Sequence, residues 1–498
     1  MELEITSMSV YTALFIVLIL LFIRKKLMSN LSSSTTHLPP GPWSVPVIGN
    51  MHQLAFRQPH HRLTELAKSY GPVLRLQLGQ VPAVIISSAD AAKQVLKLRE
   101  NQFLERPSLL AAEIMLYNRS DIIFAPYGDH WRQMKKIAIL ELLTPKRVQS
   151  FKSIREEEVS NFIKFLYSKA GEPVNLSRKI LSVINCIISV TSTGKVSEKQ
   201  DEIIRVITDA IAAAGGFSVA DAFPSFKLLH LITGMSSKLS RIHRQADEIL
   251  EEIINEHKAN KTESEPHNIL DVLLHIQNSG DLEFPLSNDT IKAMILEMFG
   301  AASDTSSATL EWTMSEMMKN PYVMEKAQEE VREVFSGKGY VDESEFHKLK
   351  YLKMVIKESL RMHPPMALIP RECNEKSTVN GYEIYPKTRV LVNVWAIGRD
   401  PNSWADPEQF RPERFLEGST DFKGNDFELL PFGAGKRMCP GLTMAMANIE
   451  LILAQLLYHF NWKLPGGANP ENFDMAEAFA LAITRKVDLH LIPIPYQL

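Results

Sequence analysis

The chain has 498 residues, of which 45% are hydrophobic and 23% charged, and its formal net charge is −3. This composition is typical of a large globular protein, and the absence of a basic excess argues against nucleic acid as a partner. The only cysteines are Cys186, Cys373 and Cys439, which are too few and too scattered for a disulfide framework. No repeat of fixed period is visible, so solenoids and propellers are excluded.

The first 26 residues are predicted to be a membrane anchor. Residues 5–23, ITSMSVYTALFIVLILLFI, are about as many as a bilayer span requires, and Arg24, Lys25 and Lys26 follow at once. Acidic residues before this run and basic residues after it place the C-terminal side in the cytoplasm. A cleaved signal peptide is the alternative, but it would need basic residues before the apolar core and a small-residue cleavage site after it.

Residues 27–42 are predicted to form a polar tether and a proline-rich hinge. The tether contains SNLSSSTTH, and the hinge contains LPPGP, which proline prevents from continuing a helix. Residues 43–498 show no break in composition that would divide them, so we expect a single large domain after the hinge.

Within this domain the patterns predict a mainly α fold with small β-sheets. Residues 73–79 alternate apolar and polar side chains and residues 81–88 follow closely, which predicts a hairpin. Asn380 and Gly381 lie between two short strand-like runs and predict a second hairpin. Helices are predicted over residues 240–259, 287–320 and 320–336, and an exposed loop over residues 258–268.

The longest predicted helix has an unusual centre. Ser287 or Asn288 can cap its start, and Pro321 ends it. The small residues 300–303 would let a large flat group approach the helix backbone. Asp304 and Thr305 follow them, and an acid beside a hydroxyl in mid-helix needs partners. A close helix crossing with a solvated Asp304 is the alternative interpretation.

A charged network is predicted further along the chain. Glu358 and Arg361 are three residues apart on one helix, so they lie on the same face and can pair. Arg414 in FRPERF could complete a three-member ion network. Because surface pairs contribute little, such a network matters mainly if it holds something nearby rigidly.

Residues 431–441, PFGAGKRMCPG, place Cys439 in a glycine-rich loop before a strongly apolar helix. Gly433, Gly435 and Gly441 permit backbone angles that aim N–H groups at the sulfur, and Arg437 and the helix N-terminus favour the thiolate. Neither a cluster of zinc ligands nor the partners of a cysteine protease are evident. A lone thiolate in such a loop indicates haem iron, with Cys439 as the metal ligand.

Four motifs in this order make the whole chain resemble the cytochrome P-450 family of haem-thiolate monooxygenases: PPGP, AASDTS, ESLR with PERF, and FGAGKRMCPG. The last one matches the family signature F-x-x-G-x-R-x-C-x-G at every fixed position. The resemblance implies a cytochrome P-450 fold behind a transmembrane helix, haem b as cofactor and dioxygen as co-substrate. It also implies electrons from NADPH, delivered by a membrane-bound NADPH–cytochrome reductase.

The resemblance assigns roles around the haem. Cys439 would be the axial ligand, and the residues expected to bind the cofactor around it are Arg437, Trp131, Lys135, Arg371, Phe432, Gly433 and Gly441. Lys135 stands where the family has arginine, which replaces a bidentate contact to a propionate with a point charge. Asp304 and Thr305 match the family's acid–alcohol pair in proton delivery. Ala302 stands where glycine is usual, which bears on how the helix kinks there.

The resemblance also suggests a substrate class and a location. Residues 127–151 and 215–235 resemble plant A-type microsomal enzymes that oxidise terpenoids, particularly macrocyclic diterpenes such as casbene. An apolar substrate pocket is therefore expected, with contributions from Ala301, Met366, Leu368, Ile369 and Leu481. The enzyme would be a single-pass protein of the endoplasmic reticulum membrane with its catalytic domain facing the cytoplasm. The alternatives are a haem-thiolate isomerase or dehydratase that acts on hydroperoxides without a reductase, and a non-catalytic haem-binding protein.

Overall fold

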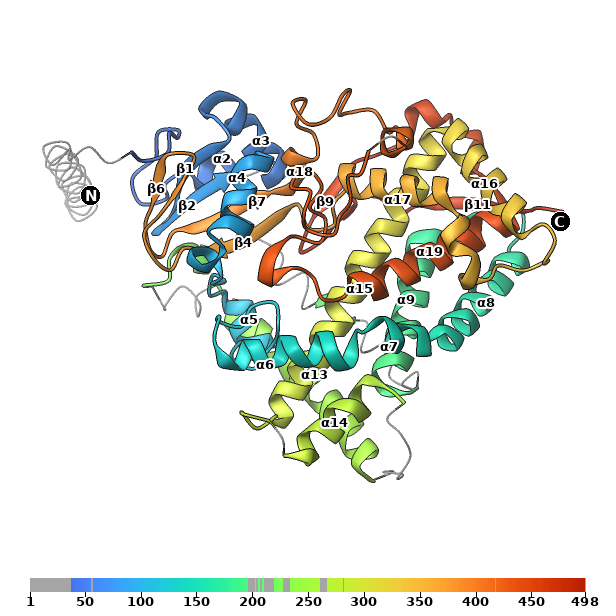
Figure 1. Ribbon diagram of the computed structural model, residues 1–498, viewed down its shortest axis with the longest axis horizontal. Helices are drawn as coiled ribbons and strands as arrows, with labels where there is room; N and C mark the ends of the chain where they lie inside the picture. Colours follow the sequence, from blue (N-terminus) through green and yellow to red (C-terminus); the bar gives the residue numbers. More distant parts are fainter. Residues whose placement is uncertain are drawn as a thin grey trace, which may run out of the picture.

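The computed structural model describes residues 37–497, except 55–56, 196–201, 203–204, 207, 210–218, 227–232, 260–266, 281 and 417. The predicted anchor and most of the predicted tether lie outside these residues. Among the described residues, no helix is long and apolar enough to span a membrane. The described part is mainly helical with small sheets, as predicted (Figure 1).

The helices are α2 (Met51–Leu54), α3 (Pro59–Tyr70), α4 (Ala89–Lys93), α5 (Leu110–Met115), α6 (Asp129–Ile137), α7 (Pro145–Ser150), α8 (Lys152–Ser168), α9 (Leu176–Thr193), α11 (Val219–Ala222), α13 (Met235–Ala259), α14 (Ile269–Ser279), α15 (Asn288–Lys319), α16 (Pro321–Phe335), α17 (Lys350–Met362), α18 (Val394–Ile397) and α19 (Leu442–His459). The strands are β1 (Val73–Leu78), β2 (Val81–Ile86), β3 (Val174–Asn175), β4 (Leu368–Glu372), β5 (Ser377–Val379), β6 (Tyr382–Ile384), β7 (Arg389–Asn393), β8 (Phe460–Lys463), β9 (Glu477–Phe479), β10 (Ile483–Arg485) and β11 (His490–Pro495).

The largest sheet has the order β1-β2-β7-β4 and lies with α2, α3 and α4 on one side of the molecule (Figure 1). The first predicted hairpin is confirmed, since β1 and β2 pair antiparallel with Val73 opposite Ile86. The second is confirmed as well, since β5 and β6 pair antiparallel across Asn380 and Gly381. Both turn residues have positive φ, 48° and 82°, which explains why asparagine and glycine occupy the turn.

The predicted long helix is confirmed as α15, which runs unbroken through Ala302 and the residues around it. The Ser287 hydroxyl accepts a hydrogen bond from the Thr290 N–H at 3.1 Å and caps the start, while Pro321 begins the next helix, α16. Helix α13 begins at Met235, earlier than predicted, and extends through Ala259. It ends at the residue predicted for the helix, so residues 258 and 259, which the predicted loop also included, are helical.

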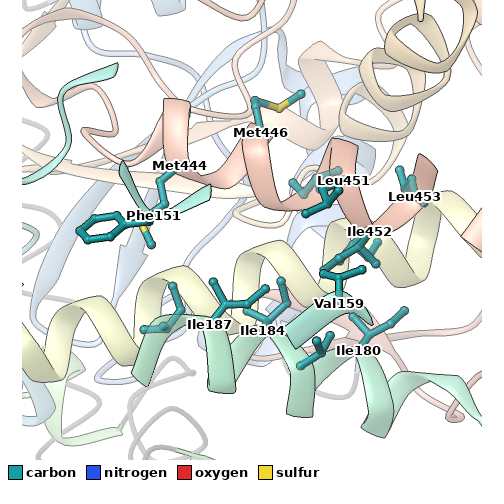
Figure 2. Close-up of a cluster of buried hydrophobic side chains, with 14 of the residues drawn as sticks. Phe151, Val159, Ile180, Ile184, Ile187, Met444, Met446, Leu451, Ile452 and Leu453 are labelled. Atoms are coloured by element: carbon teal, nitrogen blue, oxygen red, sulfur yellow. The ribbon is translucent and has the colours of Figure 1, made fainter. Parts of the chain in front are cut away.

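The main core lies between α9, α15 and α19. Ile180, Ile184 and Ile187 recur at helical spacing on α9 and are fully buried. Figure 2 shows them in one cluster with side chains of α19, among them Leu451 and Ile452. Because this cluster holds α19 in place, it also fixes the position of the glycine-rich loop that leads into the N-terminus of α19.

Candidate functional site

The loop before α19 positions the Cys439 sulfur. Gly433 and Gly435 both have φ of 71°, and a Cβ on Gly435 would lie 2.1 Å from the Leu96 carbonyl oxygen, so glycine is required there. Gly441 was predicted to need a similar conformation, but its φ is −84°. It contributes instead through its N–H group, which donates a hydrogen bond to the sulfur of Cys439.

A cavity of about 240 Å³ opens beside this sulfur between α6, α15, β4 and the loop. The structure brings all the residues predicted to bind the cofactor into its lining: Trp131, Lys135, Arg371, Phe432, Gly433, Arg437, Cys439 and Gly441. These residues lie on separate parts of the chain, so only the fold assembles them.

The electrostatics of the sulfur differ from the expectation. Cys439 is accessible from the cavity but lies deep in the protein, and this burial raises the pKa of its thiol. The Gly441 N–H and the Lys135 ammonium oppose the increase. Arg437, predicted to favour the thiolate, is engaged elsewhere: its guanidinium donates hydrogen bonds to the backbone carbonyls of Leu104, Ile122 and Ala125. A thiolate at this depth therefore needs a positive partner inside the cavity.

An excess of positive charge lines the cavity. Burial is the main cause that lowers the pKa of Lys135 to about 8, of Arg371 to about 9 and of Arg437 to about 10. The positive charge of Arg437 contributes to the lowering for Lys135 and Arg371. Arg106 also lines the cavity, and burial and the same positive charge hold its pKa well below its ordinary value. Four buried cationic side chains at one end of a cavity require anionic partners.

Glu297 and Asp121, two of the carboxyl groups near these cations, do not supply that balance. Glu297 lines the cavity and Asp121 lies close to it, but burial raises the pKa of both, which favours their neutral forms. A cofactor with an electrophilic metal centre and two carboxylates at its edge would satisfy both the sulfur and the cations. Haem b has this arrangement of charge, so the residues present fit it.

The hydrogen bonds of the lining residues hold the cavity walls together. The Trp131 indole N–H donates to the Ile122 carbonyl at 2.9 Å, and the Arg437 guanidinium lies 4.3 Å from the centre of the Trp131 ring system. The Lys135 ammonium donates to the Met438 carbonyl at 2.5 Å, which ties α6 directly to the Cys439 loop. Because each wall is tied to another, the cationic groups are preorganised.

Asp304 and Thr305 face different surroundings. Thr305 lines the cavity and its hydroxyl donates to the Ala301 carbonyl at 2.7 Å. Asp304 is not among the residues that line the cavity, and its carboxylate accepts a hydrogen bond from the Ala482 N–H. Burial raises the pKa of Asp304 to about 6. The acid therefore sits beside the cavity wall and the alcohol on it.

A second cavity of about 220 Å³ adjoins the first and is mostly apolar. Ala301 and Met366 line both cavities, Ile369 lines the one beside Cys439, and Leu368 and Leu481 line the second. All five residues predicted for the substrate pocket thus lie at one of the two cavities. None of the described residues between 206 and 226 lines either cavity.

Sequence reasoning missed Arg106 and did not single out Glu297, and both residues line the two cavities. The Glu297 carboxylate accepts a hydrogen bond from the Ile122 N–H at 2.8 Å, and Arg106 donates to the Pro370 carbonyl. The only signal for Arg106 was an arginine before a proline, and Glu297 looks like an ordinary helix residue. Tertiary structure alone reveals both.

The predicted ion network is formed. The Glu358 carboxylate pairs with Arg361 at 2.7 Å and with Arg414 at 2.9 Å. All three side chains are at most 4% exposed, so the network is internal and not a solvated surface bridge. Arg361 also donates to the carbonyls of Gly398, Pro407 and Gln409, which fastens α17 to the segment that precedes the Cys439 loop.

The comparisons with known proteins agree with this site. Residues 39–489 match the family model described as cytochrome P450, so the chain belongs to the cytochrome P450 family of monooxygenases. This family uses haem b with dioxygen and electrons that reach it from NADPH through a reductase.

Similar curated proteins span nearly the whole chain. The chain is 54% identical to cytochrome P450 726A27 of Euphorbia lathyris, over 100% of this chain and 99% of that relative. It is 50% identical to premnaspirodiene oxygenase of Hyoscyamus muticus, over 97% and 98% of the two chains. Among solved structures, a zebra fish cytochrome P450 with abiraterone has a TM-score of 0.76 and 25% identity, covering 88% of this chain and 99% of its own.

Proposed function

We propose that this P450 inserts one oxygen atom from dioxygen into a plant terpenoid, either a diterpene such as casbene or a sesquiterpene. The observation that carries the proposal is the apolar second cavity, which meets the Cys439 cavity at Ala301 and Met366. A hydrocarbon in this cavity would gain from burial and would face few polar side chains. Support comes also from a relative named premnaspirodiene oxygenase.

The residues of the Cys439 cavity would hold haem b. Cys439 would bind the haem iron through its sulfur, and Arg106, Arg371 and Arg437 would neutralise the propionates together with Lys135. Trp131, Phe432, Gly433 and Gly441 would shape the walls around the porphyrin. Haem b, when bound, supplies dioxygen activation and transfer of one oxygen atom to the substrate.

Thr305 and Asp304 would manage protons. The Thr305 hydroxyl lies on the cavity wall and can pass a proton to a group bound there. Asp304 lies beside the wall with a pKa raised by burial to about 6, so it can both bind and release a proton near neutral pH. Ala301, Met366, Leu368, Ile369 and Leu481 would position the substrate and so select the carbon attacked.

The enzyme would lie at a cellular membrane. Residues 1–26 would anchor it in the endoplasmic reticulum membrane, residues 27–42 would act as tether and hinge, and residues 43–498 would face the cytoplasm as the catalytic domain. Electrons would come from a membrane-bound NADPH–cytochrome reductase.

The test is turnover in microsomes that contain the full chain and a plant NADPH–cytochrome reductase, with casbene or premnaspirodiene as the substrate. We expect a product that is heavier than the substrate by one oxygen atom and that depends on NADPH and reductase. Retention of label from ¹⁸O₂ in this product would confirm the source of the oxygen. A hydroperoxide converted without NADPH would instead favour the isomerase or dehydratase. No turnover of casbene or of premnaspirodiene with NADPH and reductase present would contradict the proposed substrate class.

A further inference from the structure

The hairpin of β9 and β10 forms part of the wall of the second cavity. Its strands pair antiparallel with Ile483 opposite Phe479, and Phe479, Ala480 and Leu481 line the cavity. A two-stranded hairpin is marginally stable by itself, so other elements must fix its position.

Helix α15 holds the β10 side of the hairpin. The Trp312 indole N–H donates to the Ile483 carbonyl at 2.9 Å, and the Ile483 N–H donates to the Pro365 carbonyl at 2.8 Å. Asp304 accepts from the Ala482 N–H in the turn. These bonds fix the turn and the second strand. None of them involves β9, so other contacts must fix the first strand.

Glu477 fastens β9 to other elements, chiefly through its carboxylate. One of its oxygens lies 2.8 Å from His60 Nε2 and 2.8 Å from His61 Nε2, both at the start of α3. The Glu477 side chain is 8% exposed and that of His60 is fully buried. The Gln58 side-chain amide donates to the Glu477 carbonyl at 2.8 Å, so both the side chain and the backbone of Glu477 are fastened to the same segment.

The other oxygen of Glu477 faces a third histidine. His363 Nδ1, just after α17, lies 3.9 Å from it. The opposite nitrogen of this ring, Nε2, lies 2.7 Å from a carboxylate oxygen of Glu316 on α15, and the ring stacks on Trp312 with the two ring centres 4.2 Å apart. Glu477 therefore connects β9 with α3 and α17, and through His363 with α15.

The contact also reaches the cavity wall directly. The His60 ring stacks on the Phe479 ring, with centres 5.7 Å apart and planes inclined by 23°. Since Phe479 lines the second cavity, a shift of the His60 ring would displace the wall of that cavity. Burial raises the pKa of Glu477, but the neighbouring rings of His363, His60 and His61 outweigh it and hold the pKa well below its ordinary value.

We propose that Glu477 is a positioning residue, which fixes the β9–β10 hairpin, and with it Phe479 and Leu481, as a wall of the substrate cavity. The proposal rests on the proposed role of the second cavity in substrate binding, and not on the terpenoid class. Loss of the carboxylate would loosen β9, which would keep its pairing with β10 and the Gln58 bond, while β10 stays fastened to α15. The wall would then move without loss of the haem site.

The same cluster has the ligand types of a metal site, since His60, His61 and Glu477 offer atoms within 4.8 Å of one another. The local charge argues against this use. Arg399 is close enough that its positive charge is stabilised by Glu477, and His363 lies on the other side of the same carboxylate. A divalent cation there would be repelled by the guanidinium of Arg399, which already interacts with the only carboxylate of the cluster.

The test compares Glu477→Ala and Glu477→Gln with a control, Glu471→Ala, which alters an exposed carboxylate six residues earlier. Binding of two haem ligands, imidazole and clotrimazole, is measured by spectral titration of the haem-loaded full chain. Imidazole reports the iron alone, whereas the three aromatic rings of clotrimazole must occupy the space next to the hairpin. The difference spectrum of the reduced protein with carbon monoxide reports haem incorporation in each variant.

We expect Glu477→Ala to weaken clotrimazole binding by about fivefold or more while the Kd for imidazole stays within about twofold. Glu477→Gln keeps the shape and an acceptor for the histidines, so it should stay near wild type, as should the control. Equal changes for both ligands, or tighter or unchanged clotrimazole binding in Glu477→Ala, would overturn the proposal. A stoichiometric metal ion in the wild-type protein that Glu477→Ala loses would overturn it too.

A second measurement applies if Glu477→Ala does not incorporate haem. His61 is 42% exposed, so His61→Ala should fold while removing one contact to the carboxylate. We expect amide hydrogen exchange in residues 477–485 to become faster in this variant, with exchange in α19 unchanged. Unchanged exchange in the hairpin would contradict the proposal. Neither experiment uses a terpene, so a result that contradicts the role of Glu477 is distinct from a result that contradicts the proposed function.

Discussion

Asp304 and Thr305 are neighbours in the sequence, yet the helix turns their side chains in different directions. The alcohol lies on the wall of the Cys439 cavity, and the acid reaches the turn of the β9–β10 hairpin. The carboxylate of Asp304 thus has a structural contact in addition to its proposed role with protons. Its environment disfavours the charged form, and this gives a measurable dependence on pH.

We predict that Asp304→Asn stabilises the protein against heat, and more strongly at pH 7.5 than at pH 5. Asparagine can still accept the Ala482 N–H, while the buried charge is removed. The change of pKa from 3.8 to about 6 is equivalent to roughly 3 kcal/mol. Because the folded-state pKa is raised, wild-type stability falls as pH increases from about 4 to about 6, and the cost is complete above that window.

The measurement is the melting temperature of the haem-loaded wild type and variant at both pH values. Asp289→Asn, which alters an exposed carboxylate at the start of the same helix, is the control and should show no difference that grows with pH. An Asp304→Asn protein with the same melting temperature as wild type at pH 7.5 would contradict the prediction.

Lys135 offers a second test at the scale of one residue. We predict that Lys135→Met speeds loss of haem to an acceptor protein by about tenfold, because a charge-assisted hydrogen bond to the Met438 carbonyl and a cation facing the cavity disappear. Lys135→Arg restores the cation and should hold haem at least as well as wild type. Lys136→Met, at the exposed neighbouring position, should lose haem at the wild-type rate. Equal rates for Lys135→Met and Lys136→Met would rule out a role for this ammonium.

Among the elements, α15, α17 and the loop before α19 carry most of the site. Their sequences could be interpreted because each combines a regular pattern with an exception: small residues in mid-helix, a buried charge pair, or glycines around a cysteine. The β9–β10 hairpin was not predicted, since its three-residue strands have no long alternation. Arg106, Glu297 and Glu477 escaped notice because their roles depend on contacts with residues far away in the sequence.

The ion network on α17 gives a prediction for an element. Glu358→Gln should destabilise the folded protein by on the order of 3 kcal/mol, because Arg361 and Arg414 would remain buried without a counter-charge. The measurement is the denaturant midpoint, with the yield of haem-bound protein beside it. Glu172→Gln is a control with the same three-residue spacing, since Glu172 pairs with Lys169 on the surface, and it should behave as wild type. A Glu358→Gln protein of wild-type stability would remove the reason to regard the network as structural.

For the whole molecule, the sequence was sufficient to predict a mainly helical fold with small sheets, because long periodic helices dominate the chain. The two cavities could not have been located in this way, since their walls come from α5, α6, α15, β4 and the β9–β10 hairpin together. The predicted anchor, residues 1–26, would hold the folded domain at a membrane. It lies outside the described residues and remains a prediction.

We predict that the full chain resists extraction from microsomes by alkaline carbonate, and that a chain without residues 1–26 is released. The physical reason is the apolar run of residues 5–23, which is long enough to span a bilayer. Immunoblots of pellet and supernatant provide the measurement, and the carbon monoxide spectrum confirms that the shortened chain is folded. Release of the full chain would contradict the anchor.

The most direct test of the whole account is the difference spectrum of the reduced protein with carbon monoxide, in wild type, Cys439→Ser and Cys373→Ser. Cys373 is buried away from the cavity, and burial raises the pKa of its thiol to about 11, so it is a control for the loss of a sulfur. We expect the red-shifted Soret band of a thiolate-bound haem in wild type and Cys373→Ser, and its absence in Cys439→Ser. Persistence of this band in Cys439→Ser, or its absence from folded, haem-loaded wild type, would contradict the assignment of Cys439 as the haem ligand.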